Sequence, residues 1–166
     1  MYSIGDRVVY GSSGIMEVVD VCEERVGGVC RQYYVLKEML SNSESKTFVP
    51  TDNKKLVASM HPLLTIGEAE ELLTSSKNMK SAEWPKDNRT RAEKFRSVIE
   101  SQDRAGMISI IRSLSESNRQ NREEGKKNIF SDELFMHKAE RMLYPELSFV
   151  LGISEDEVRE LILFER

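Results

Sequence analysis

The stretch Val26-Gly27-Gly28-Val29 predicts a β-hairpin early in this chain. Paired glycines between β-forming runs are typical of a two-residue hairpin turn, because glycine adopts positive φ angles at no steric cost. In this register Cys22 pairs with Tyr33, and Cys30 pairs with Arg25. The two cysteines then lie three strand positions apart, roughly 10 Å, which is beyond disulfide reach. We expect both thiols to be free.

The hairpin belongs to a β-rich region that ends near residue 57. Glycine and Ser/Asn clusters separate its short β-forming runs, which are Asp6–Tyr10, Gly14–Glu23, Cys30–Met39, Lys46–Pro50 and Lys55–Val57. Strands at such short spacing imply a small, strongly bent sheet or barrel. We therefore predict a β-domain over residues 1–57, followed by a linker at 58–64.

The periodicity becomes helical after the linker and predicts a compact domain of five helices over residues 65–166. Thr65 with Glu68 and Ser154 with Glu157 match the capping-box pattern at the start of the first and last helices. Gly152 is expected to end the fourth helix. The inner face of that helix should carry Leu134, Phe135, Ala139 and Leu143. The predicted fold class is α+β, with two domains.

Composition and charge favour a globular protein of the cytoplasm. Charged residues make up 31% of the 166 residues and hydrophobic residues 39%, with a formal net charge of −4. No apolar run approaches the ~20 residues of a membrane helix, and the first residues lack a stretch typical of a signal peptide. We expect no membrane partner.

The sequence offers little for catalysis or metal binding. The two histidines, His61 and His137, and the two cysteines have no spacing typical of a zinc or haem site. Gly11-Ser12-Ser13-Gly14 precedes a predicted strand instead of a helix, so we interpret it as a turn and not as a phosphate loop. No Ser/His/Asp or Cys/His set is apparent. We expect a protein that is not an enzyme, with no cofactor and no small-molecule substrate.

Trp84, the single tryptophan, lies in a basic segment. Residues 77–96 contain seven Lys/Arg against three acids, a local net charge of +4. An exposed aromatic ring among cations suits a nucleic-acid strand or fork, where bases stack on the ring and phosphates attract the charges. The alternative is that Trp84 covers the core at a helix start and that the charges are only a solvated surface.

Several short motifs follow one another in a specific order. Ile4-Gly5-Asp6-Arg7-Val8-Val9-Tyr10 precedes Tyr34-Val35-Leu36-Lys37 and Val49-Pro50 with Asp52-Asn53, and the helical part adds Trp84, Lys138–Leu143 and Leu151–Glu157. This pattern resembles the CarD/CdnL family of bacterial transcription regulators over nearly the whole chain. The first 57 residues also resemble the polymerase-interacting domain of the transcription-repair coupling factor.

The resemblance implies an adaptor made of a Tudor/SH3-like β-domain and a helical DNA-binding domain. In this family the β-domain binds the β subunit of RNA polymerase. The helical domain contacts promoter DNA in the minor groove at the upstream edge of the transcription bubble, without reading its sequence. Such a protein stabilises the open complex and lies in the cytoplasm, associated with the nucleoid through RNA polymerase.

The resemblance also assigns site residues. The expected DNA contacts are the wedge Trp84 together with Lys80, Lys86, Asn88, Arg89 and Arg91. The expected polymerase contacts are Glu24, Arg25, Lys46, Phe48 and Pro50. Family members often have a basic residue at the positions of Glu24 and Phe48, so we expect the neighbouring Arg25 and Lys46 to take over that role.

Two other functions remain open. A Tudor-like domain can read peptides or methylated residues, which requires an aromatic cage built from Tyr10, Tyr33, Tyr34 and Phe48. Strand alternation places Tyr33 and Tyr34 on opposite faces, which opposes such a cage. The other possibility is an interaction scaffold that does not bind DNA, with Trp84 as an anchor between the two domains.

Overall fold

The computed structural model describes residues 1–79 and 82–164, so Lys80 lies outside the described residues. The chain divides into two compact units, Met1–Leu63 and Leu64–Arg166. The first unit is built mainly from antiparallel strands and the second from helices. The predicted α+β fold class is confirmed.

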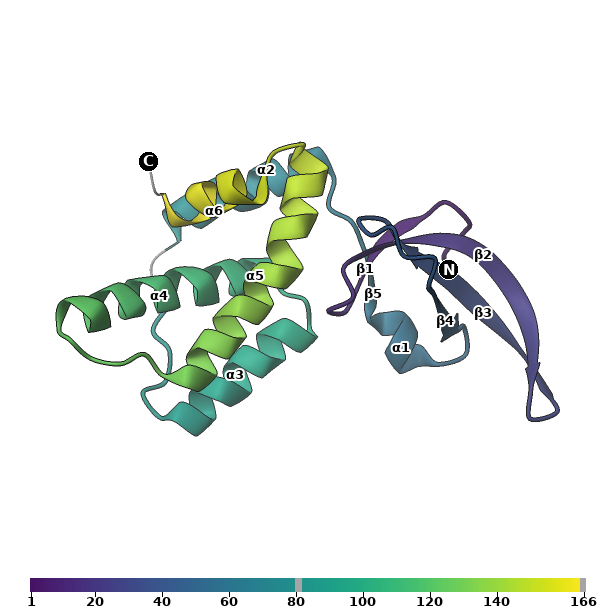
Figure 1. Ribbon diagram of the computed structural model, residues 1–166, viewed down its shortest axis with the longest axis horizontal. Helices are drawn as coiled ribbons and strands as arrows, with labels where there is room; N and C mark the ends of the chain where they lie inside the picture. The colour runs from purple at the N-terminus through teal and green to yellow at the C-terminus, as the bar shows by residue number, and fades with distance from the viewer. Residues whose placement is uncertain (80–81, 165–166) are drawn as a thin grey trace. The chain divides into compact units, whose positions relative to one another are not determined.

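The first unit is a five-stranded sheet with the strand order β4-β3-β2-β1-β5 (Figure 1). Neighbouring strands are antiparallel throughout. The strands are β1 (Arg7–Tyr10), β2 (Ile15–Val26), β3 (Val29–Glu38), β4 (Lys46–Pro50) and β5 (Met60–Pro62). A short helix, α1 (Lys54–Ala58), contacts both edge strands, β4 and β5. The sheet is therefore bent around α1.

The hairpin between β2 and β3 has the predicted register. Cys22 pairs with Tyr33, and Arg25 pairs with Cys30. Gly27 and Gly28 adopt φ angles of +61° and +83°, the positive values that a two-residue turn of this type requires. Both cysteines are free.

The last part of the first unit differs from the prediction. Residues 55–57, predicted as a β-forming run, lie in helix α1, because the Asn53 side chain accepts a hydrogen bond from Leu56 N–H (3.2 Å) and caps the helix. Residues 58–64, predicted as a linker, contain β5, which pairs with β1. The first compact unit consequently extends to Leu63.

One face of the sheet forms the core of the first unit. Its buried side chains are Val8, Met16, Val18, Tyr34, Leu36, Val49 and Met60. Because successive side chains of a strand point to opposite faces, Tyr34 enters this core while Tyr33 lies on the other face. The pairing of β2 with β3 shifts by one residue between Val18 and Asp20, as at a β-bulge. Beyond this shift, the side chains of β2 again alternate between the core face and the opposite face.

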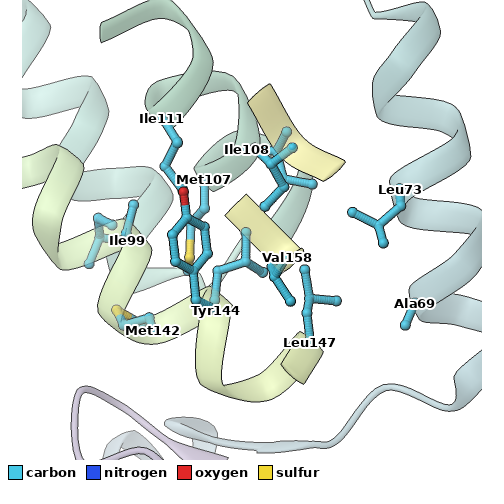
Figure 2. Close-up of a cluster of buried hydrophobic side chains, with 13 residues drawn as sticks. Ala69, Leu73, Ile99, Met107, Ile108, Ile111, Met142, Tyr144, Leu147 and Val158 are labelled. Atoms are coloured by element: carbon cyan, nitrogen blue, oxygen red, sulfur yellow. The ribbon is translucent and has the colours of Figure 1, made fainter. Parts of the chain in front are cut away.

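The second unit contains five helices within the described residues: α2 (Ile66–Asn78), α3 (Asn88–Glu100), α4 (Arg104–Glu123), α5 (Phe130–Leu151) and α6 (Glu155–Leu163). The larger of two apolar clusters in this unit contains side chains from all five helices. Figure 2 shows Leu73 of α2, Ile108 of α4, Leu147 of α5 and Val158 of α6 in this cluster. The predicted inner residues Ala139 and Leu143 are buried there, whereas Leu134 is exposed, contrary to the prediction.

The helix ends follow local capping chemistry. Both predicted capping boxes are present, at Thr65 with Glu68 and at Ser154 with Glu157. In each, the glutamate accepts hydrogen bonds from the backbone N–H and hydroxyl of the cap residue, and these bonds lower the pKa of both glutamates. Gly152 ends α5 in the left-handed region, with a φ of +66°.

A buried ion pair joins the start of α4 to α5. Arg104 donates to both carboxylate oxygens of Glu146, at 2.8 and 2.7 Å, and Glu146 is almost fully buried. The same carboxylate accepts the backbone N–H of Leu64 (3.1 Å), where the second unit begins. Glu146 therefore fixes the position of the first residue of this unit.

Candidate functional site

The strand β4 presents an aromatic side chain to solvent at the edge of the sheet. Phe48 pairs with Val35 of β3 and is 49% exposed. Lys46 and Pro50 lie two residues away on either side, so all three side chains point to the face opposite the core. The Phe48 ring packs edge-on against Tyr33, with ring centroids 6.3 Å apart. We call this surface the β4 face.

The β2–β3 hairpin extends the β4 face. Glu24 pairs with Arg31, two residues beyond the pairing of Cys22 with Tyr33, so Glu24 and Arg31 lie on the same face as Tyr33. Arg25 points to the opposite face. Four of the five predicted polymerase contacts thus share one surface, and Arg25 does not.

Sequence reasoning missed Arg31, a cation on the β4 face. Arg31 lies 3.7 Å from Asp52, and both side chains are more than half exposed. Exposed pairs of this kind stabilise little, so the Arg31 guanidinium remains available to a partner. The predicted hairpin register could have identified Arg31 as a candidate contact, because it pairs Arg31 with Glu24.

Trp84 of the helical unit is partly buried. Its ring packs edge-on against Phe95 of α3, with centroids 4.8 Å apart and an interplanar angle of 74°. It lies against a second apolar cluster, formed by Phe95, Ile110, Leu114 and Met136. Its indole Nε1 is buried and has no hydrogen-bond partner among the described residues. The ring therefore supports α3 and is only partly accessible to solvent.

Arg91 is not available as a phosphate contact, which corrects the prediction. Its guanidinium binds the Asp132 carboxylate of α5 through Nε (3.1 Å) and Nη2 (2.9 Å). It also donates to the carbonyl oxygens of Pro85 and Lys86 and to Asn88 Oδ1. With its donors used in this way and its side chain 8% exposed, Arg91 holds the segment before α3 against α5.

The other predicted cations in the described part of the chain are exposed. Lys86 is open to solvent, and Arg89 forms only an exposed pair with Glu93 (3.4 Å). Asn88 is exposed, although its side-chain oxygen accepts from Arg91. Lys80 lies outside the described residues.

Asp87, between these cations, caps α3. Its carboxylate accepts hydrogen bonds from the backbone N–H (2.8 Å) and hydroxyl (2.7 Å) of Thr90, and these bonds lower the pKa of Asp87. The helix therefore begins at Asn88, three residues after Pro85. The role of Asp87 is structural as well as electrostatic.

The described residues contain no cluster of three or more His, Cys, Asp or Glu side chains able to hold a metal ion. Nor does any helix among them have the length and hydropathy needed to cross a bilayer. His137 is exposed and forms a local contact with Glu140 (3.0 Å) on α5.

Residues 2–63 match the family model for the CarD-like/TRCF RID domain. The N-terminal unit is similar to this domain over nearly its whole length, and we call it the RID domain below. The match ends at Leu63, the same residue that ends the first compact unit. An RID domain is an RNA polymerase-interacting module, that is, a protein-interaction domain. No curated protein matches the chain at a significant level.

The RID domain does not form the aromatic cage of a methylated-residue reader. Tyr34 is buried and packs edge-on against Tyr2, with ring centroids 5.8 Å apart. Tyr33 and Phe48 lie on the opposite face, and Tyr10 packs against the core. The four rings considered for a cage are therefore divided between two faces of the sheet.

Proposed function

We propose that this chain is a transcription regulator that links RNA polymerase to promoter DNA. The RID domain binds the β subunit of the polymerase. The helical unit binds DNA at the upstream edge of the transcription bubble and stabilises the open complex without reading sequence. The observation that carries this proposal is the exposed Phe48 on the edge strand of a domain whose family interacts with polymerase.

Strand addition explains how the β4 face would bind a protein. Edge strand β4 pairs with β3 on one side, and no strand among the described residues pairs with its other side. Its free backbone groups can extend a sheet of the partner, which supplies affinity through main-chain hydrogen bonds. Phe48 would act as the apolar anchor, and Lys46 and Arg31 would provide charge complementarity.

The DNA contact would be weak by itself. Arg91 is engaged internally, which leaves Lys86 and Arg89, with Lys80 near them in sequence, as the cations of this segment. Two or three phosphate contacts correspond to a log-log salt slope of roughly −2 to −3. Since the whole chain has a net charge of −4, polymerase binding must supply the proximity, as in other bivalent complexes.

Charge reversal of the exposed cations tests the DNA arm without disturbing the core. The double variant Lys86→Glu/Arg89→Glu should shorten the lifetime of the open complex formed by full-length protein, polymerase and promoter DNA. Binding to polymerase without DNA should stay at the wild-type level. Arg159→Glu, an exposed change on α6, is the matched control. Equal lifetimes for both variants would contradict DNA binding by this segment.

The second candidate function is a polymerase-bound scaffold that does not contact DNA. The packing of Trp84 against Phe95 favours it, because an internal anchor explains this tryptophan without any ligand. On this alternative, the double charge reversal leaves the open-complex lifetime unchanged, while Phe48→Glu still abolishes polymerase binding. The two variants therefore separate the two functions.

A further inference from the structure

A groove opens in the helical unit between α2 and the turn that joins α3 to α4. Its volume is about 450 Å³, within the range of roughly 300–1,000 Å³ that is usual for binding pockets. Leu64 and Leu72, which are partly buried and pack against the core of this unit, line the groove together with Ala105. The groove therefore offers apolar surface to a ligand.

Three acidic residues line the same groove. Glu68 and Glu71 lie one turn apart on one face of α2, and Asp103 comes from the turn before α4. Glu71 is exposed and has no hydrogen bond or ion pair with any residue that the structure describes. Arg104 also lines the groove, but its guanidinium binds both carboxylate oxygens of Glu146, which compensates its charge. The groove therefore carries excess negative charge.

The turn that forms one wall of the groove is close-packed. Gln102 is 7% exposed and adopts a φ angle of +52°, a left-handed conformation that residues other than glycine keep only where the surrounding structure fixes it. A Cβ added at Gly106 would lie 2.6 Å from Asp103 Oδ2 and 2.7 Å from Val98 Cγ1. Because this wall is fixed in advance, the groove exists before any partner binds, which lowers the cost of binding.

The charges and the apolar lining together specify the occupant. Carboxylates repel phosphates, so the groove does not suit DNA. A guanidinium binds carboxylates through parallel hydrogen bonds, and the methylene groups of an arginine pack well on leucine side chains. An arginine that belongs to a protein segment matches both features.

We propose that an arginine-bearing segment of RNA polymerase binds in this groove, with its guanidinium at Glu71 and its methylene groups on Leu72. This inference rests on the proposed function, in which the RID domain already holds the chain on the polymerase. Such tethering raises the effective concentration of the groove near the polymerase surface, so that even a weak contact forms. The helical unit then has a protein contact of its own, made by residues other than those of its DNA contact.

Charge reversal at two adjacent glutamates tests the groove. Glu71→Lys places a cation in the groove, whereas Glu70→Lys makes the same change in net charge at an exposed residue of α2 that does not line it. Surface plasmon resonance measures the binding of each full-length variant to polymerase without DNA. The Kd should rise roughly tenfold for Glu71→Lys, because repulsion replaces attraction, and should stay near the wild-type value for Glu70→Lys. Equal Kd values for the two variants would overturn the proposal.

Photo-cross-linking identifies what lies in the groove. The full-length protein with p-benzoylphenylalanine at Ser75, an exposed lining residue, is assembled with polymerase and promoter DNA and irradiated. We expect a cross-link to a polymerase segment that contains an arginine, and exchange of that arginine for glutamate should restore the affinity that Glu71→Lys loses. A cross-link to DNA, no cross-link, or no restoration by the charge exchange would refute the contact.

Failure of this inference differs from failure of the proposed function. If Phe48→Glu abolishes polymerase binding and Glu71→Lys leaves it unchanged, the proposed function stands and the groove contact is refuted. If neither variant weakens polymerase binding, both are refuted. Glu71→Gln, a milder change, should weaken binding in the same direction and less than Glu71→Lys. Circular dichroism of each variant verifies that the helical unit is folded.

Discussion

Arg91 and Asp132 form a buried ion pair between α3 and α5. Arg91 Nε lies 3.1 Å from both carboxylate oxygens of Asp132, and Nη2 lies 2.9 Å from one of them. Residues 41 positions apart in sequence thereby neutralise each other inside the helical unit. The pair also determines the path of the chain from Pro85 to Asn88, because the remaining donors of Arg91 are used there.

Removing one member of this pair should strongly destabilise the helical unit. Arg91→Ala or Asp132→Ala leaves a buried charge without compensation, which costs about 3–5 kcal/mol. The loss should appear in urea unfolding followed by the helical circular dichroism signal. Arg89→Ala, an exposed change on the same helix, should stay within about 0.5 kcal/mol of wild type.

The double variant Arg91→Met/Asp132→Leu provides a further check. Because it removes both charges and keeps most of the volume, it should be less destabilised than either single variant. Additive losses in this double variant would show that the two side chains do not act as a pair.

Substitution of Trp84 should separate its structural role from a role in the open complex. Trp84→Ala removes the edge-on contact with Phe95 and should cost about 2–3 kcal/mol, less than the loss of a fully buried tryptophan. Trp84→Phe keeps an apolar ring and removes the unpartnered indole N–H, so its unfolding free energy should stay close to wild type. Thermal melting measures both changes.

Of the two variants, Trp84→Phe is the one that tests whether Trp84 contacts DNA in the open complex. With its fold intact, a shortened open-complex lifetime would assign the Trp84 ring to the DNA contact. An unchanged lifetime would leave it as an anchor of α3.

Phe48→Ala should weaken polymerase binding while leaving the RID domain folded. Phe48 is about half exposed, so truncation removes little core packing. Loss of a central aromatic anchor typically costs at least about 2 kcal/mol, or roughly a thirtyfold weaker Kd. Surface plasmon resonance with immobilised polymerase measures this. Ile4→Ala, an exposed apolar change before β1, is the control, and equal affinities for the two variants would contradict the assignment.

The two capping boxes should make stability sensitive to acid. Hydrogen bonds from the backbone N–H groups of Thr65 and Ser154, followed by those from their hydroxyls, lower the pKa of Glu68 and Glu157 in the folded protein. Their contribution is complete above the ordinary carboxyl range, about pH 4, and is lost as the pH falls through the lower folded-state pKa.

Melting temperatures between neutral and acidic pH test this dependence. The double variant Glu68→Gln/Glu157→Gln should melt lower than wild type near neutral pH, and the difference should shrink on acidification. Glu160→Gln, an exposed glutamate of α6 outside both boxes, should follow the wild-type curve. A constant difference at every pH would mean that the ionised carboxylates are not what stabilises these helices.

The features predicted correctly are those encoded over a few neighbouring residues. The register of the β2–β3 hairpin follows from Gly27-Gly28 and strand alternation, and the helix starts at Ile66 and Glu155 follow from a cap residue and a glutamate three positions later. Each of these interactions joins residues within one helical turn or one pair of adjacent strands. The residues involved are therefore close in sequence, and their pattern can be recognised without the structure. The match of residues 2–63 to the RID domain has the same origin, in the order of such local motifs.

The functional surfaces depended on contacts between distant residues. Arg91 appeared to be one of several exposed cations, and only the packing of α3 against α5 brought it to Asp132 and removed it from the surface. The same packing partly buried Trp84 against Phe95 and left Phe130 exposed. Sequence alone thus determined the two-unit α+β architecture, the hairpin register and the helix caps. Tertiary structure alone decided which charges and rings face solvent, because burial depends on partners that the local pattern does not contain.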